Sequence, residues 1–223
     1  MPEPNLLAIR FKRWSDELWT GLRDYFGSLG RRRAEPINDR ASLRRFLETR
    51  ASFVAQTSLY GYLRTRAGQM YPQLFEGEQF ARSMNIAKWH VWLACLSDLS
   101  VYVGGLLAGQ SPTRAQTAGR LLQDVVAEIL SATGTPVDAD AEFTAHAERV
   151  RTRLAGCHWD RVADDETPFR ESPTALIRWA PIIENLKELD ETIVRNSIRF
   201  RWQEIRRTVR RDLDADALLQ ATT

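Results

Sequence analysis

The residues best suited to chemistry in this chain lie together in one apolar stretch. His90, Cys95, Ser97 and Asp98 are residue types from which enzymes build a nucleophile, a general base and a group that orients the base. On a single helix, however, His90 and Ser97 would be about 10 Å apart along the axis. A triad needs hydrogen-bond contact between its members. We therefore favour a polar cluster inside a core helix and keep a small helical hydrolase around His90, Ser97 and Asp98 as an alternative.

A second candidate feature is an arginine on an apolar helical face. Arg50 falls within the face that Leu43, Leu47 and Val54 define, and Arg64 lies close beside that face. A buried charge without a partner is costly, so each buried arginine or aspartate needs an opposite charge. We hypothesise that Asp98 contacts Arg50 or Arg64 inside the protein, which makes Arg50 a candidate site residue.

The sequence gives little support for a bound metal. The three histidines are His90, His146 and His158, and Glu142 stands four residues before His146. A ferritin-like di-iron site needs glutamate and histidine three residues apart, twice over. We place Glu142 and His146 on a solvated helix edge. A cation held by His158 and the loop acids is an alternative to a plain acidic loop (Asp160, Asp164, Asp165 and Glu166). We assign no metal ligand and no cofactor.

These side chains must be positioned by residues 86–109, the most apolar stretch of the chain. The stretch is long enough to cross a membrane. Asp98 stands at its middle, where a carboxylate costs roughly 2.5–3.5 kcal/mol on insertion into a bilayer. A helix that is apolar on all sides is typical of the centre of a folded domain. We predict a central helix and keep a membrane span as the alternative.

This central helix is not uniform around its axis. One face carries mainly small residues (His90, Ala94, Ser97, Val101, Gly104 and Ala108), and the opposite face carries bulky ones (Trp92, Leu99 and Leu106). Small residues let a neighbouring helix approach closely. We expect the helix over about 39–66 to pack there.

Helical periodicity extends along the rest of the chain, and no segment alternates with a period of two. Ser111 and Pro112 mark a helix start, and Gly134 marks a helix end. Residues 157–172 are predicted to form a loop, and residues 214–223 a frayed tail. The fold class is all-α: a single-domain bundle of six to eight helices spanning residues 1–223, with the central apolar helix at about 86–109.

Residues 1–33 form a basic amphipathic segment in which Leu7, Phe11, Trp14, Leu18 and Leu22 share one helical face. Basic helices of this kind can lie on anionic membrane surfaces. Acidic residues in the same segment weaken that interpretation (Asp16, Glu17 and Asp24). We expect this helix to pack on its own bundle, with peripheral membrane binding as the alternative.

The last predicted helix, from about Pro181 to Leu213, is acidic in its first half and rich in arginine in its second half. A helix dipole favours this order of charges. We predict that its apolar residues form one buried face (Ile182, Leu186, Leu189, Ile193, Ile198, Trp202, Ile205 and Val209). Nucleic-acid binding through the arginines is a further alternative that we do not favour.

Composition restricts the functional class. The chain has 223 residues, a net charge of +2, 43% hydrophobic residues and 27% charged residues, which is typical of a soluble globular protein. Two cysteines do not form a disulfide framework, and no secretory signal is expected, so we predict a cytoplasmic protein, or one associated with a membrane through residues 1–33. The leading prediction is a non-enzymatic interaction or scaffold module whose partner is another protein or a second copy.

Overall fold

The computed structural model describes residues 36–68, 77–109 and 111–220, and these form a helical bundle. The described part contains seven α-helices and no β-strand, so the predicted all-α class is confirmed. The predicted amphipathic helix within residues 1–33 lies outside the described residues.

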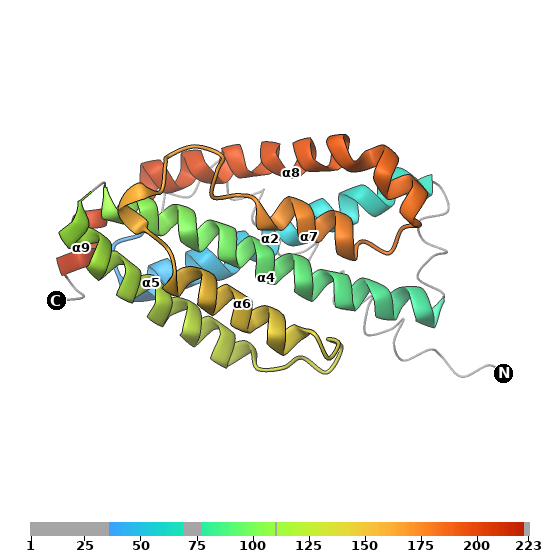
Figure 1. Ribbon diagram of the computed structural model, residues 1–223, viewed down its shortest axis with the longest axis horizontal. Helices are drawn as coiled ribbons and strands as arrows, with labels where there is room; N and C mark the ends of the chain where they lie inside the picture. Colours follow the sequence, from blue (N-terminus) through green and yellow to red (C-terminus); the bar gives the residue numbers. More distant parts are fainter. Residues whose placement is uncertain (1–35, 69–76, 110, 221–223) are drawn as a thin grey trace.

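The central helix is α4 (Glu78–Ala108), which runs through the middle of the bundle in Figure 1. It packs against α2 (Arg40–Ala67), α5 (Pro112–Thr133), α6 (Phe143–Ala155) and α7 (Glu171–Trp179). Within the described residues α4 is the one helix long and apolar enough to cross a membrane, and 94% of its most apolar window is buried inside the protein. The neighbouring helices thus provide the apolar environment that a bilayer would provide for a membrane span.

The helix ends follow the local chemistry of the sequence. Asp39 and Ser42 form a reciprocal capping box at the start of α2. Ser111 caps α5, and Pro112 occupies its first turn, as predicted. Gly134 ends α5 with φ of +59°, a backbone conformation that glycine adopts without strain. These signals set the helix lengths that align the side chains of the core.

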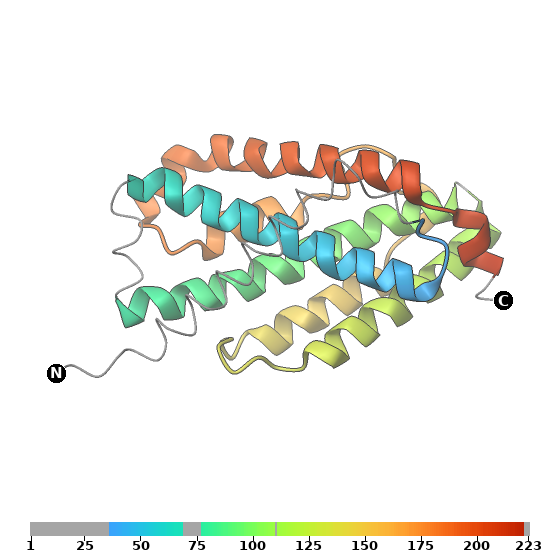
Figure 2. The same cartoon turned by 180° about the vertical axis from the view of Figure 1, so that it is seen from behind.

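The remaining long helix, α8 (Glu184–Asp212), lies on the outside of the bundle. It packs on α7 and α2, so these two helices stand between much of α8 and the central helix (Figures 1 and 2). At its C-terminal end Ile37 pairs with the backbone of Asp212 and Asp214, which ties the start of α2 to the end of α8. One face of α8 consequently has no helix over it among the described residues.

The predicted frayed tail is wrong for most of its length. Residues Ala215–Gln220 form the short helix α9. Leu218 is buried, and the carboxylate of Asp214 accepts a hydrogen bond from the backbone N–H of Ala217. Burial of one leucine and one capping interaction therefore give order to a segment whose composition alone gives no clear helical pattern.

Candidate functional site

Polar side chains of α4 form a row along the face that meets α6, α7 and the connection between them. His90, Asp98 and Tyr102 are each fully buried, and each has a partner from these later segments. His90 and His146 are 56 residues apart in sequence, as are Ser97 and Arg153. Because both pairs have the same sequence separation, α4 and α6 run in the same direction, and residues seven apart on one helix meet residues seven apart on the other.

His90 lies at one end of this row. Its Nε2 is 2.8 Å from a carboxylate oxygen of Asp140, and its Nδ1 is 2.8 Å from the Nδ1 of His146. The imidazole also stacks on the ring of Trp179, with centroids 3.6 Å apart. Both ring nitrogens of His90 are thus engaged, and one face of the ring is covered by Trp179.

These contacts determine where the protons lie. A carboxylate accepts, so the Nε2–H of His90 donates to Asp140. A neutral His90 then accepts at Nδ1 from the Nδ1–H of His146. Burial lowers the pKa of His90, and burial together with the neighbouring His90 lowers the pKa of His146 to about 4. Both rings are therefore neutral near pH 7, with His90 unprotonated at Nδ1 and His146 unprotonated at Nε2.

Asp98 anchors the second part of the row. One of its carboxylate oxygens accepts from the guanidinium of Arg153 at 2.6 Å and from the backbone N–H of Glu171 at 3.1 Å. The other oxygen accepts from the backbone N–H of Ser172 at 2.8 Å. Glu171 and Ser172 are the first two residues of α7, whose preceding residue gives no side-chain cap. Asp98 therefore caps α7 from another helix and places a negative charge at its positive end.

The predicted contact of Asp98 with Arg50 or Arg64 is wrong, because Asp98 pairs with Arg153 of α6. Arg50 faces α8, where the nearest opposing charges are those of Asp212 and Glu204. Burial lowers the pKa of Arg50, and these two carboxylates oppose that effect. Asp98 points toward α6 and α7, whereas α2 covers a different side of α4. Burial raises the pKa of Asp98, and Arg153 acts in the opposite direction.

The structure does not bring His90 together with Ser97 and Asp98. The hydroxyl of Ser97 accepts a hydrogen bond from Arg153 at 3.0 Å, while both ring nitrogens of His90 bond to other residues. Ser97 thus has no histidine positioned to take its proton. Burial raises the pKa of Cys95 well above its usual range, which makes this thiol a poor nucleophile as well.

Tyr102 and the connection between α6 and α7 form the third part of the row. The phenol of Tyr102 donates to Asp164 at 2.7 Å, and Arg210 of α8 binds the same carboxylate at 2.6 Å. Burial and the bond to Asp164 raise the pKa of Tyr102 to about 12. Asp164 belongs to the loop for which we considered a bound cation. Its carboxylate instead binds Arg210 and so holds α8 to this loop.

The predicted loop over 157–172 contains a short 3-10 helix, η2 (Trp159–Arg161), and a deeply buried side chain. Trp159 fills a slot between α4 and α5. A Cβ added at Gly104 would lie 2.2 Å from the Trp159 ring, and one at Gly119 would lie 2.5 Å from it. The expectation that α2 fits the small-residue face at Gly104 is therefore wrong, because an indole occupies that place.

No group of three or more histidine, cysteine or acidic side chains in the described ranges has the arrangement of a metal site. His146 is half-buried against His90, so our placement of this residue on a solvated edge is wrong. Glu142 does lie on the surface, where it faces Arg178 at 3.6 Å.

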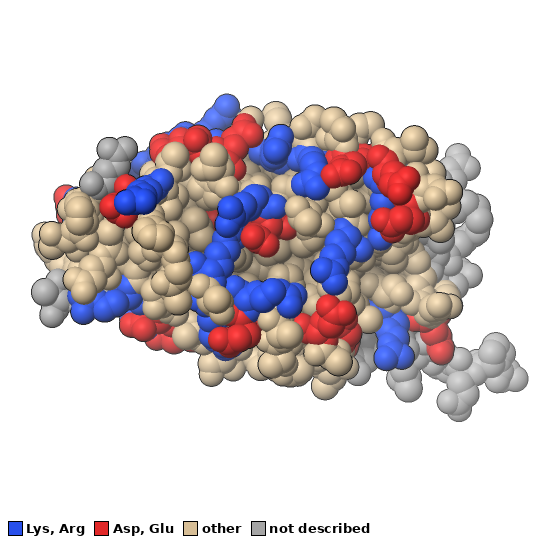
Figure 3. All heavy atoms as spheres, viewed as in Figure 1, with Lys and Arg blue, Asp and Glu red and all other residues tan. Residues whose placement is uncertain are grey.

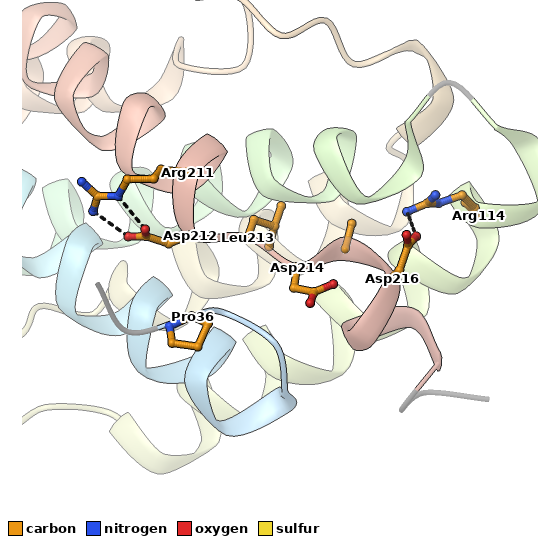
Figure 4. A pocket seen from close by; sticks show the side chains of 8 residues that line it. Pro36, Arg114, Arg211, Asp212, Leu213, Asp214 and Asp216 are labelled. Atoms are coloured by element: carbon orange, nitrogen blue, oxygen red, sulfur yellow. Dashed lines mark hydrogen bonds and ion pairs between the residues drawn. The ribbon is translucent and has the colours of Figure 1, made fainter. Parts of the chain in front are cut away.

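A pocket of about 640 Å³ lies where α8 meets α9, and Figure 4 shows its lining. Its charged groups already pair or cap: Arg114 with Asp216 at 3.1 Å, Arg211 with Asp212 at 2.6 Å, and Asp214 with the backbone of α9. The pocket is an open depression at the surface. Its polar groups stabilise the junction of the two helices.

The outer face of α8 differs from all these buried clusters. Leu189, Ile193 and Phe200 are 75%, 70% and 74% exposed, and they follow one another at spacings that place them on one side of a helix. Our prediction that Leu189 and Ile193 belong to the buried face is wrong. The face toward the bundle instead contains Val194, Ile198, Trp202, Ile205 and Val209, so α8 has two apolar faces.

Sequence reasoning found His90 and Asp98 but missed their partners Arg153, His146 and Asp140. A usable signal was present, because His146 and Arg153 are seven residues apart on α6, like His90 and Ser97 on α4. Two parallel helices that carry polar residues at the same spacing can bring those residues into contact.

No protein-family model, curated protein sequence or solved structure that was compared with this chain matches it.

Proposed function

We propose that this chain is a non-enzymatic helical interaction module that binds another protein through the outer face of α8. The observation that carries the proposal is the line of exposed apolar side chains at Leu189, Ile193 and Phe200. Isolated exposed apolar residues are ordinary, but several on the same side of one helix are typical of a protein–protein interface.

The buried polar row of α4 supports a structural role for the residues that first suggested catalysis. His90, Asp98 and Tyr102 each have hydrogen-bond partners, as in the bonds of Asp98 to Arg153 and to the start of α7. A buried network of this kind fixes the relative positions of helices. The hydrolase alternative would instead require a nucleophile and a base in contact at a solvent-accessible site.

The nucleic-acid alternative has little support from the arginines of α8. Arg195 binds Glu191, Arg210 binds Asp164, and Arg211 binds Asp212, so that of the exposed arginines of α8 only Arg199 and Arg207 have no ion-pair partner among the described residues. Figure 3 shows basic and acidic groups side by side over one face of the protein. Nucleic-acid binders place unpaired basic groups along a common surface.

The membrane alternative depends on residues 1–33, which lie outside the described residues. We retain a cytoplasmic location as part of the proposal. Its support is chemical: Cys95 is buried as a free thiol, and Cys157 is half-buried and also free. Free thiols without disulfides are usual in a reducing compartment.

A photo-crosslinking experiment tests the proposal. A benzophenone amino acid replaces Phe200 in the full chain, and the matched control carries it at Val137, which is 95% exposed and away from α8. We expect a discrete covalent adduct in living cells from position 200 and none from position 137. Ile193→Glu should remove the adduct, because it places a charge in the apolar strip. Equal adducts from both positions, or none from either, would overturn the proposal.

A further inference from the structure

We propose that the partner of the α8 outer face is a second copy of this chain, and that the two α8 helices pair antiparallel around Ile193 and Asn196. This inference rests on the proposed interaction function, because it names the occupant of the same face. Three observations support it: the spacing of the exposed residues, the direction of charge along α8, and the position of Asn196.

Five residues on the outer side of α8, of which Leu186 is half-buried and the other four are exposed, have the spacing of a coiled-coil seam. Leu186, Leu189, Ile193, Asn196 and Phe200 are separated by three, four, three and four residues. This repeat keeps one side of a helix against a partner helix and lets side chains interdigitate. The strip is narrow and straight, which suits a second helix better than a flat or concave partner surface. Two identical strips related by a two-fold axis can cover each other.

Charge along α8 selects the antiparallel direction. Glu188 is exposed in the first half of the helix, and Arg199 and Arg207 are exposed in the second half. None of the three has an ion-pair partner within the described ranges of the chain. Parallel pairing would bring like charges together, whereas antiparallel pairing places the acidic half of each helix against the basic half of the other. Antiparallel helix dipoles also favour this arrangement.

The seam contains the polar residue Asn196 near its middle and the polar residue Gln203 at its end. Antiparallel pairing with Ile193 opposite Asn196 places Leu189 opposite Phe200 and Leu186 opposite Gln203 of the other copy. The two Asn196 side chains then lie beside the two-fold axis, where their amides can hydrogen-bond to each other. A single asparagine in an apolar seam sets register and orientation at some cost in affinity.

The size of the surface sets the strength of the pairing. Stable dimers usually bury about 800 Å² on each partner, and one short helical seam provides less than this. The pairing is therefore reversible and depends on protein concentration. A charge in the seam should abolish it, since each substitution acts twice in a symmetric dimer.

Sedimentation equilibrium of the purified full chain over roughly 1–300 µM tests self-association. We expect the average mass to rise from 25.6 kDa toward twice that value. Ile193→Glu should hold the mass at 25.6 kDa throughout, while the matched control Val137→Glu should behave like the unsubstituted chain. A chain that stays monomeric at every concentration overturns the inference, as does association unaffected by Ile193→Glu.

Disulfide trapping tests the orientation. In a Cys157→Ser background, one chain carries Leu186→Cys and another carries Gln203→Cys. Antiparallel pairing around Ile193 and Asn196 places these positions opposite each other, so an equal mixture should form a mixed disulfide dimer on mild oxidation. Each chain alone should form none, because two copies of position 186 would be about 25 Å apart. Disulfide dimers from each chain alone would indicate parallel pairing and overturn the inference, as would no disulfide in the mixture.

The cellular adduct at position 200 separates the two proposals. An adduct with the mass of two chains agrees with both of them. An adduct with a different protein, together with a monomeric purified chain, overturns self-pairing and leaves the interaction module intact. A monomeric chain without any adduct overturns both.

Discussion

Folded proteins usually bury apolar side chains and expose charged ones. The side of α4 that meets α6 and α7 and the outer face of α8 both depart from this rule. This side of α4 buries an aspartate, a histidine and a lysine, while the outer face of α8 exposes a leucine, an isoleucine and a phenylalanine. Each of these three buried groups on α4 has an ion-pair or hydrogen-bond partner within the chain, as Asp98 has Arg153. On α8 the exposed apolar strip has no such compensation among the described residues.

This difference shows which unusual residues belong to folding and which to function. Burial of a charge is stable only if partners are built around it, and Asp98 has three hydrogen-bond donors. Exposure of a large apolar side chain costs little and needs no compensation. Residues of the first kind should therefore control stability, and those of the second kind should control association.

The largest effect should come from Asp98→Ala. This change leaves Arg153 without its carboxylate and uncaps α7, so we expect a loss of about 3–5 kcal/mol in the free energy of unfolding. Urea denaturation followed by circular dichroism measures this loss. The matched control is Glu148→Ala, which removes a carboxylate that is 66% exposed and should cost no more than about 1 kcal/mol. Similar losses for the two variants would mean that the inner row does not control stability.

A smaller loss is expected where Trp159 enters the bundle. Gly104→Ala adds a methyl group against the indole and should cost about 1–3 kcal/mol, because the tryptophan must move. The control Gly61→Ala meets only the end of an arginine side chain at 3.4 Å and should stabilise the helix by roughly 0.5–1 kcal/mol. In a Trp159→Ala background the penalty at Gly104 should largely disappear. Equal effects of the two glycine substitutions would contradict this packing.

The histidine pair should make stability depend on pH. The pKa of His146 is lowered to about 4 in the folded protein, so the unfolded state binds protons first as the pH falls. The contribution of His146 to stability is then fully present above about pH 6.5 and is lost between pH 6.5 and 4, by on the order of 3 kcal/mol.

Thermal unfolding over this pH range measures the contribution of the histidine pair. His146→Asn keeps a donor for His90 but does not titrate, so it should flatten the profile. His158→Asn, at an exposed position in the loop, is the matched control. If the thermal stability of His146→Asn depended on pH as that of the unsubstituted chain does, the histidine pair would not be the source of the pH dependence.

The smallest effect on stability should come from the outer face of α8. Ile193→Glu and Phe200→Glu change exposed positions, so the free energy of unfolding should shift by no more than about 0.5 kcal/mol. The same two variants should nevertheless lose association. A loss of several kcal/mol would show that this strip belongs to the core.

The sequence was sufficient to predict the central helix, the start of α5 at Ser111 and Pro112, and the span of α8, because these depend on local periodicity and capping. It was not sufficient to identify the partner of Asp98. Helical periodicity shows that a residue is buried but not which neighbour covers it, and Arg153 became the partner through the parallel alignment of α4 and α6. The exposure of Ile193 was missed for a related reason: apolar spacing does not reveal that a helix has only one covered side.

Hydrogen exchange measured at low and high concentrations of the full chain tests the contrast between the two faces most directly. The account predicts that raising the concentration slows exchange in peptides covering residues 186–200 of α8 and leaves peptides covering residues 86–98 of α4 unchanged. Ile193→Glu should abolish the concentration dependence without altering exchange in α4. Slowing that is confined to α4, or exchange that is independent of concentration in both helices, would contradict it.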